Sequence, residues 1–205
     1  MTATPTTRKG IATRQKILRA AGRVFARDGY VDARMLDIAT EAGLSTGGLY
    51  RYFDNKTDVF AAVIADIHEE FYERSGHTRG LLAQDPYAAL AASNRGYIEH
   101  YYENRDIMRV FIEAAAIEQQ FRETLRSMRV RHVRRFVGAH RSIDPEGLVA
   151  GVRLEVAAEA LACLVEQCCY VWFAQEKDND VPVTIDEAVR VTTQAWYDVF
   201  FAARS

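Results

Sequence analysis

The sequence predicts an all-α protein with an N-terminal three-helix domain of the helix-turn-helix type, residues 8–57, and a larger helical domain, residues 58–205. Apolar residues recur at helical spacing over most of the 205-residue chain. Charge is divided unevenly: residues 8–57 hold ten Lys or Arg against five Asp or Glu, whereas the other residues hold 16 against 23. A basic module joined to an acidic body indicates contact with phosphate groups through one end, although a chance segregation of charge would give the same pattern.

The first helix is predicted over residues 13–27. Its inward stripe follows core-facing helical spacing and consists of Ile17, Leu18, Ala21, Val24 and Phe25. The opposite face is basic, and each of its residues is either a phosphate contact or simply a solvated charge. Residues 1–12 are polar and contain Pro5 and Gly10, so we expect no regular structure there.

Two short helices joined by a tight turn are predicted over residues 36–56. Ile38 and Ala42 lie at helical spacing, and Gly43 follows where a chain leaving a helix adopts a positive φ. Ser45 then occupies the N-cap position of the second helix, where its hydroxyl accepts from a free backbone N–H. This order of helix, glycine turn and helix is the helix-turn-helix pattern, whose second helix enters the major groove of DNA.

The second helix, residues 45–53, is predicted to turn Leu49 and Phe53 inward. Its outer face carries hydroxyl and guanidinium groups, from Thr46, Tyr50, Arg51 and Tyr52. Gly47 and Gly48 would each weaken a helix by about 1 kcal/mol relative to alanine, which is understandable if another surface approaches the backbone closely. The alternative for the two tyrosines is packing against the core, for example against Leu18 or Phe60.

The run AGLSTGGLYRYFDNKTDVF, residues 42–60, resembles the signature of the tetracycline-repressor (TetR) family, AGVS-x-G-x-LY-x-HF-x-[SN]K-x-x-L. Residues 13–30, TRQKILRAAGRVFARDGY, are similar to the first helix of that family. The resemblance covers about the first 60 residues, and the rest matches in length and helical character. The chain departs from the pattern at Ala33-Arg34-Met35, where Thr or Ser is usual, and at Tyr52, where His is usual.

The resemblance implies a DNA-binding surface on the second helix and its flanks. By resemblance, Arg34 contacts a phosphate or a base edge, and Tyr50 and Lys56 contact phosphates. Chemistry makes Arg51 and Thr46 the candidates for base edges, because Arg pairs bidentately with guanine and Thr offers a hydroxyl or a methyl group. The full set of expected DNA-binding residues is Arg34, Ser45, Thr46, Gly47, Gly48, Tyr50, Arg51, Tyr52 and Lys56.

The remaining helices are predicted over residues 56–75, 86–102, 107–116, 118–140, 144–175 and from 184 to the end. Asn55 caps the first of these, with Asp58 at the third helical position. Asp144-Pro145-Glu146 is expected to start the helix that runs to Gln175. Thr184 and Glu187 have the spacing of a capping box. The arginines of residues 118–140 are expected to form a solvated face, with attraction of an acidic ligand as the alternative.

The family resemblance implies a pocket between the helices of the larger domain. Aromatic side chains there favour a small, largely apolar effector with one or two polar anchors. The candidate ligand-binding residues are Tyr97, His100, Tyr101, Phe111, Glu113, Phe121, Trp172 and Phe173. The two C-terminal helices are expected to form a homodimer with a second copy, since two recognition helices about 34 Å apart read a palindrome. The alternative is that both helices pack within one monomer.

Several other classes of protein find little support in the sequence. We expect no signal peptide, no membrane-spanning segment and a cytoplasmic location. The three cysteines, Cys163, Cys168 and Cys169, are interpreted as free buried thiols, and no spacing predicts a metal site or a cofactor. The five histidines are scattered, and His100 and Glu103, three residues apart, are attributed to an exposed polar face, so catalysis is not expected.

The expected function is therefore a transcriptional repressor that binds palindromic operator DNA and releases it when a small molecule binds. Two alternatives remain. The protein either recruits a partner to DNA without a small-molecule ligand, or acts as an activator.

Overall fold

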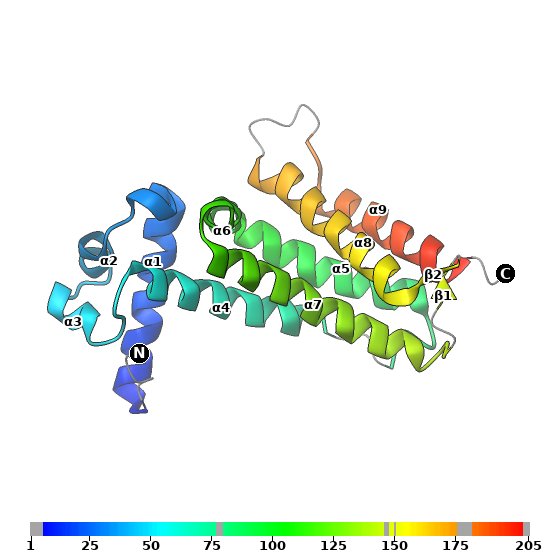
Figure 1. The fold of residues 1–205 in the computed structure, drawn as a ribbon, viewed down its shortest axis with the longest axis horizontal. Coiled ribbons are helices and arrows are strands. Elements are labelled where there is room, and N and C mark those ends of the chain that lie inside the picture. Colours follow the sequence, from blue (N-terminus) through cyan, green and yellow to red (C-terminus); the bar gives the residue numbers. More distant parts are fainter. Residues whose placement is uncertain (1–5, 77–79, 146–147, 150, 176–181, 203–205) are drawn as a thin grey trace. The chain divides into compact units, whose positions relative to one another are not determined.

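The computed structural model describes residues 6–76, 80–145, 148–149, 151–175 and 182–202 (Figure 1). In these ranges the elements are α1 Arg8–Asp32, α2 Met35–Glu41, α3 Thr46–Tyr50, α4 Lys56–Arg74, α5 Pro86–Glu103, α6 Arg105–Ile117, α7 Gln119–Arg141, β1 Leu148–Val149, β2 Val152–Arg153, α8 Leu154–Cys169, a π-helix Tyr170–Ala174 and α9 Ile185–Phe200. The only strands in the described residues, β1 and β2, have two residues each and form one hairpin, so the predicted all-α class is confirmed.

The chain divides into two compact units. Unit 1 comprises Met1–His68 and Asp106–Phe121, and unit 2 comprises Glu69–Arg105 and Arg122–Ser205. Two of the boundaries between the units fall inside α4 and α7. The third falls between Arg105 and Asp106, the first two residues of α6. Unit 1 therefore contains the predicted helix-turn-helix segment together with nearly all of α6.

α1 begins earlier than the sequence predicted. The Thr7 hydroxyl accepts from the Gly10 N–H at 3.2 Å and caps the helix. The expectation that residues 8–12 lack regular structure is therefore wrong, because a capping threonine outweighs the polar composition. Near the other end, Gly29 has φ 74° and breaks the helical path.

The core of unit 1 is a cluster of aromatic rings. Phe60 of α4 lies 4.7 Å from Phe25 of α1 and 5.1 Å from Phe121, between ring centroids. Phe111 of α6 lies 6.3 Å from Phe121. All four rings are fully buried, and burying each one stabilises the unit by roughly 1.5–3 kcal/mol.

Unit 2 is organised around α5, which packs along α9, and both helices contact α8. The Asn94 side-chain amide donates to the Thr193 hydroxyl at 3.2 Å, and Arg95 pairs with Asp186 at 2.8 Å. These contacts hold one face of α9 against its own chain. Val191 and Val199, on the rest of α9, are exposed.

Gly96 allows α5 to cross the end of α4 at very short range. A Cβ at this position would lie 2.3 Å from the Arg74 carbonyl oxygen, closer than any real contact. The two backbones touch there without an intervening side chain.

The predicted helix over residues 144–175 is wrong at its beginning. Leu148 pairs with Arg153 and Val149 with Val152 in an antiparallel hairpin, and α8 begins only at Leu154. Gly151, with φ 78°, lies between the two strands. The Asp-Pro start signal at 144–145 is therefore not followed by a helix.

By contrast, the predicted capping box at Thr184 and Glu187 is confirmed, with both of its hydrogen bonds present.

The segment Leu154–Ala174 is long and apolar enough to cross a membrane, a criterion that helices of soluble proteins also meet. It contains three glutamates, at 155, 159 and 166. Several of its large apolar side chains are exposed, namely Val156, Leu164 and Val171.

Candidate nucleic-acid interface

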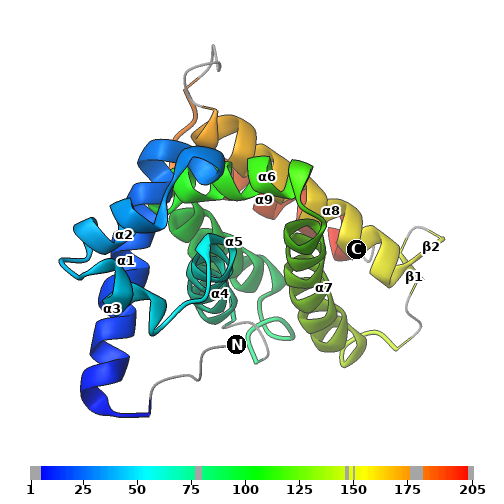
Figure 2. The ribbon, with the colours of Figure 1, turned by 60° about the vertical axis from the view of Figure 1, so that its left-hand side comes forward.

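The turn between α2 and α3 has the geometry that the sequence predicted. Gly43 has φ 61°, its N–H donates to the Thr40 carbonyl oxygen at 2.9 Å, and the Leu44 N–H donates to the Ala39 carbonyl oxygen at 2.9 Å. These two bonds form a Schellman motif, which satisfies carbonyl groups left open at the end of α2. The helices α1, α2 and α3 lie side by side in both views (Figures 1 and 2).

α3 is capped as predicted but is shorter. The Ser45 hydroxyl accepts from the Gly48 N–H at 3.1 Å. The helix ends at Tyr50, so residues 51–53, predicted as helical, are not: Arg51 and Tyr52 form a turn and Phe53 has no regular structure. Leu49 and Phe53 are buried as expected and anchor this segment to the rest of unit 1.

The two glycines of α3 differ in their surroundings. A Cβ at Gly47 would meet nothing within 4 Å, whereas a Cβ at Gly48 would lie 3.2 Å from the Ser45 capping hydroxyl. Gly48 therefore protects the cap, while Gly47 leaves an open space on the helix surface. A glycine that the fold does not require is consistent with close approach by another molecule.

None of the nine expected DNA-binding residues is buried. Five are exposed: Arg34, Ser45, Gly47, Tyr50 and Arg51. The other four, Thr46, Gly48, Tyr52 and Lys56, are half-buried. Tyr50 exposes 48% of its surface, so the alternative of core packing does not apply to it.

Arg34 and Lys56 flank this surface in different ways. Arg34 is the N-cap residue of α2, but its side chain makes no capping hydrogen bond. The Lys56 ammonium donates to the Val31 carbonyl oxygen at 2.6 Å and lies 5.0 Å from the centre of the Tyr30 ring. Two of its three N–H donors remain for a further acceptor.

Some basic residues of unit 1 are neutralised by acids. Arg23 pairs with Glu41 and Arg27 pairs with Asp28, each at 2.7 Å. Other basic side chains have no acidic partner among the described residues, including Arg14, Lys16, Arg19, Arg34 and Arg51. The positive charge that is free to act therefore lies on the exposed side of α1 and around α2 and α3.

Tyr30 connects three segments of unit 1. Its hydroxyl donates to a Glu118 carboxylate oxygen at 2.5 Å and lies 2.9 Å from the Thr57 hydroxyl. Burial, followed by the hydrogen bond to Glu118, raises the pKa of Tyr30 to about 12. The residue stays neutral at ordinary pH and holds the end of α1 to the start of α4.

Unit 2 contains a cavity of about 90 Å³. Its apolar walls include Leu90, Val133, Phe136, Val165 and Trp196. Its polar walls include Asn94, Tyr97, Arg135 and Glu166. This concave, mixed surface is the candidate effector site.

The structure places the expected ligand-binding residues at several locations. Tyr97 lines the cavity. Phe111 and Phe121 lie in the aromatic core of unit 1, and Glu113 pairs with Arg109 on the surface. Phe173 is buried, with its ring 5.4 Å from the Tyr102 ring, and the adjacent Trp172 is half-buried. Tyr101 belongs to α5 and is fully buried.

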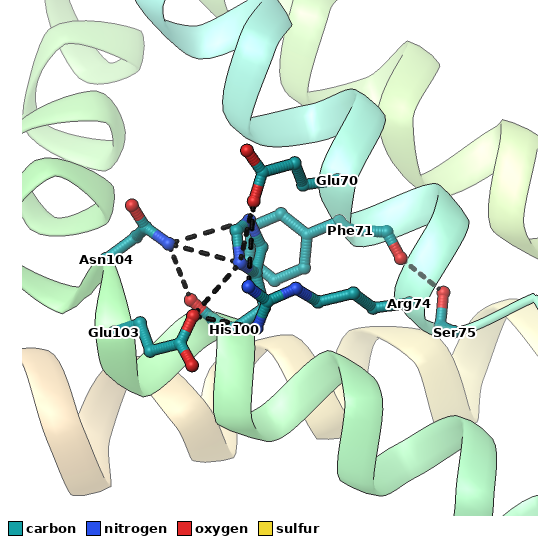
Figure 3. A network of polar contacts seen from close by, with 7 residues as sticks. All are labelled: Glu70, Phe71, Arg74, Ser75, His100, Glu103 and Asn104. Carbon is teal, nitrogen blue, oxygen red and sulfur yellow. Dashed lines mark hydrogen bonds and ion pairs between the residues drawn. The ribbon is translucent and has the colours of Figure 1, made fainter. Parts of the chain in front are cut away.

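His100 belongs to a separate polar network between α4 and α5 (Figure 3). Its Nδ1 lies 3.5 Å from Glu103 and 3.7 Å from Glu70, and its ring packs 4.5 Å from the Phe71 ring. Arg74 also pairs with Glu103, at 2.7 Å. The assignment of His100 and Glu103 to an exposed polar face is therefore wrong for the histidine, which is 2% exposed.

The expectation that the arginines of residues 118–140 form a solvated face is wrong for Arg135, which is half-buried and lines the cavity. Arg135 lies three residues after His132, which also lines the cavity. Residues three apart lie on the same helix face.

No group of three or more His, Cys, Asp or Glu side chains suited to a metal ion occurs in the described part of the chain.

Comparison with known proteins gives a consistent family assignment for the N-terminal module. Residues 17–63 match the model described as bacterial regulatory proteins, tetR family. The uncharacterised HTH-type regulator YdgC of Bacillus subtilis is 37% identical over 60 residues, which cover 29% of this chain and 31% of that protein. The HTH-type transcriptional repressor NicS of Pseudomonas putida is 24% identical over 189 residues, covering 90% of this chain and 86% of that protein.

Solved structures resemble the whole chain. A TetR-like regulator from Rhodococcus sp. RHA1 has a TM-score of 0.70 with 24% identity, covering 91% of this chain and 94% of that one. AibR, solved in complex with isovaleryl coenzyme A and operator DNA, has a TM-score of 0.63 with 21% identity, covering 92% and 98%. At these identities the likeness establishes the fold.

Proposed function

Because the chain belongs to the tetR family of helix-turn-helix transcriptional regulators, we propose that it is a repressor that binds palindromic operator DNA as a homodimer. A small, largely apolar effector would release it. The observation that carries the proposal is the surface of α3. This surface presents an arginine, a tyrosine and an open glycine position on a capped helix that follows a Schellman turn.

In this proposal residues 8–57 bind DNA and residues 58–205 bind the effector and the second copy. Arg51 and Thr46 meet base edges, whereas Tyr50 meets a phosphate. Lys56 reaches a second phosphate with the N–H donors that Val31 leaves open. Arg34 and the basic residues of α1 that lack acidic partners add electrostatic attraction that is independent of sequence.

The exposed apolar side chains of α8 and α9 support a homodimer. Val156, Leu164 and Val171 on one segment and Val191 and Val199 on the other leave an apolar surface in contact with water. Covering this surface with the same surface of a second copy would create an isologous interface with two-fold symmetry. That symmetry matches a palindrome with half-sites one DNA turn apart, about 34 Å.

Effector release follows from thermodynamic linkage. If the effector binds more tightly to a dimer whose α3 helices are wrongly spaced for DNA, it lowers DNA affinity by the same factor that DNA lowers effector affinity. The cavity of unit 2 favours this mechanism over recruitment of a partner without a ligand. We place the protein in the cytoplasm, where its DNA target is found, and assign it no catalytic role.

The first experiment is selection of bound sequences from random duplex DNA by the purified protein, with its mass in solution measured in parallel. We expect a palindromic consensus and a dimeric mass. A folded protein that enriches no sequence, and that carries no bound molecule by native mass spectrometry, would contradict the proposal.

Two single substitutions test the assigned phosphate contacts. Tyr50→Ala and Lys56→Ala should each weaken binding to all sequences by a similar factor. The slope of log affinity against log salt should become shallower by about 0.9 for each phosphate that the variant no longer neutralises. Wild-type affinity in both variants would show that a different surface binds DNA.

A further inference from the structure

The chemistry of the unit 2 cavity specifies a class of effector, an inference that rests on the proposed function. The relevant group is Arg135 of α7, which lines the cavity together with Tyr97 and Trp196. Its guanidinium differs from those of Arg129 and Arg131 on the same helix, because each of those two pairs with a glutamate and Arg135 does not.

The hydrogen-bond partners of Arg135 are carbonyl, hydroxyl and imidazole groups rather than carboxylates, and they include His132 Nδ1, 3.4 Å from Nη2. Nη1 donates to the Tyr72 carbonyl oxygen at 2.5 Å, and Nη2 donates to the Ser75 carbonyl oxygen and hydroxyl at 2.8 and 2.7 Å. No carboxylate pairs with Arg135 among the described residues. Burial lowers the pKa of Arg135, which reflects the cost of holding this charge out of water.

Two other cavity residues offer donors without acceptors. The Trp196 indole Nε1 is buried and has no hydrogen-bond partner in the described part of the chain, and Trp196 as a whole is only 8% exposed. The Tyr97 hydroxyl has no hydrogen bond within the described residues, and burial raises its pKa well above the usual value, so it remains a donor. Arg135 and Tyr97 therefore offer donors to a ligand in a cavity whose other polar walls include Asn94 and Glu166.

The one carboxylate that lines the cavity among the described residues is already neutralised. Glu166 of α8 accepts from Nε and Nη2 of Arg129 at 2.8 and 2.6 Å. The charges of Glu166 and Arg129 cancel, which leaves the positive charge of Arg135 uncompensated. An anion entering the cavity would gain a charge-assisted hydrogen bond without displacing an existing ion pair.

We propose that the effector is a small monocarboxylate whose carboxylate group pairs with Arg135 and whose short apolar body contacts Leu90, Val133 and Val165. A cavity of about 90 Å³ is smaller than the roughly 150 Å³ that holds benzene. A short acid therefore fits this volume better than an aromatic one.

The test is calorimetric titration of the full-length protein with acetate, propionate and butyrate, each compared with its uncharged amide. At least one acid should bind at least tenfold more tightly than its amide, and Arg135→Gln should reduce this ratio to below threefold. The same acid should weaken binding of wild-type protein to its selected operator. Equal binding of acids and amides, or no binding of any acid, would overturn the proposal, as would preferential binding of propylamine.

The matched control is Arg131→Gln. Arg131 lies on the same helix and over the same Tyr72 ring, 3.6 Å from its centre compared with 4.2 Å for Arg135, but it is paired with Glu69. This variant should retain the preference for the acid. Disappearance of that preference in Arg131→Gln as well would mean that general charge, rather than the cavity, attracts the anion.

A second variant keeps the test valid if Arg135→Gln does not fold. Ala162→Leu places a larger side chain in the cavity wall and leaves Arg135 intact, so it should abolish binding of the acid. Ala92→Leu, at an exposed position of α5 that does not line the cavity, should not. Binding of the acid by Ala162→Leu at wild-type affinity would refute the assigned site.

The two proposals fail separately. Operator binding by the protein without ligand tests the proposed function alone. A protein that binds an operator but no acid retains its proposed function and refutes the carboxylate site. A protein that binds the acid through Arg135 but enriches no DNA sequence supports the site and refutes the proposed function.

Discussion

The arginines around α2 and α3, which are Arg34 and Arg51, differ from Arg129 and Arg131 of α7 in whether a carboxylate pairs with them. On α7, Arg129 pairs with Glu166 and Arg131 pairs with Glu69. Around α2 and α3, Arg34 and Arg51 are exposed and have no acidic partner within the described residues. The segment around α2 and α3 contains only these two arginines, whereas α7 contains several, of which Arg129 and Arg131 are held by carboxylates. Arg34 and Arg51 are therefore left for an external polyanion.

The number of arginines in a helix is therefore a poor predictor of anion binding, whereas the presence or absence of a carboxylate partner for each arginine is a good one. An arginine held by a carboxylate contributes mainly to stability. An arginine without one remains available to a phosphate, a base edge or a ligand carboxylate. Substitutions in the two regions should therefore separate stability from DNA affinity.

The largest effect is expected for Arg129→Ala. This substitution leaves the Glu166 carboxylate, about three-quarters buried, without its partner, so the free energy of unfolding should fall by about 2 kcal/mol. DNA affinity of the folded fraction should not change. Urea denaturation and gel shift measure the two quantities, with Arg126→Ala, exposed on the same helix, as the control that should stay within about 0.5 kcal/mol. An equal decrease in both variants would contradict the role of the pair.

The second effect concerns DNA affinity. Arg51→Ala should reduce affinity for the preferred operator about 10- to 100-fold and relax base preference at one position of each half-site. The midpoint of thermal unfolding should remain unchanged, because the exposed Arg51 side chain has no ion pair within the described residues to stabilise the fold. Repeating the sequence selection with the variant measures the preference. An unaltered consensus would assign Arg51 to a phosphate instead.

A third prediction uses the open space at Gly47. Gly47→Ala should leave stability unchanged or raise it by up to about 1 kcal/mol, since nothing obstructs the new Cβ and alanine favours the helix. DNA affinity should fall about tenfold if the backbone approaches the DNA closely, because the added methyl group overpacks the contact. Gly138→Ala on α7, which is also unobstructed, is the control and should change only stability. Unimpaired DNA binding by Gly47→Ala would place this helix surface away from the groove.

The smallest effect is expected for Arg131→Ala. Both members of its ion pair with Glu69 are substantially exposed, so the decrease in stability should be below about 1 kcal/mol and should shrink further in high salt. DNA affinity should be unchanged. Thermal unfolding at low and high ionic strength measures the difference, and a decrease as large as that for Arg129→Ala would undermine the distinction between buried and exposed pairs.

Local backbone signals were the most predictable part of the molecule. The positive φ of Gly43, the Ser45 and Asn55 caps and the Thr184 capping box all follow from interactions within a few residues, and all are present. The Asp-Pro signal at residue 144 failed because capping chemistry permits a helix without requiring one. A two-residue hairpin forms there instead.

The candidate sites were predictable to different extents. The candidate DNA-binding surface comes from one continuous stretch of the chain, so a sequence motif is enough to propose it. The cavity gathers residues from α5, α7, α8 and α9, and helical periodicity alone does not tell which arginine of α7 turns inward. Aromatic content led to Tyr97, which lines the cavity, but equally to Phe111 and Phe121, which form the core of unit 1.

The crossing of α4 and α5 at Gly96 has a consequence for sequence variation. Even alanine would bring its Cβ to 2.3 Å from the Arg74 carbonyl oxygen, and backbone atoms of two helices do not move aside as a flexible side chain would. In a saturation library, position 96 should therefore accept only synonymous codons. Relatives that carry another residue there must space these two helices differently, so this one position distinguishes chains that share this helix crossing from those that do not.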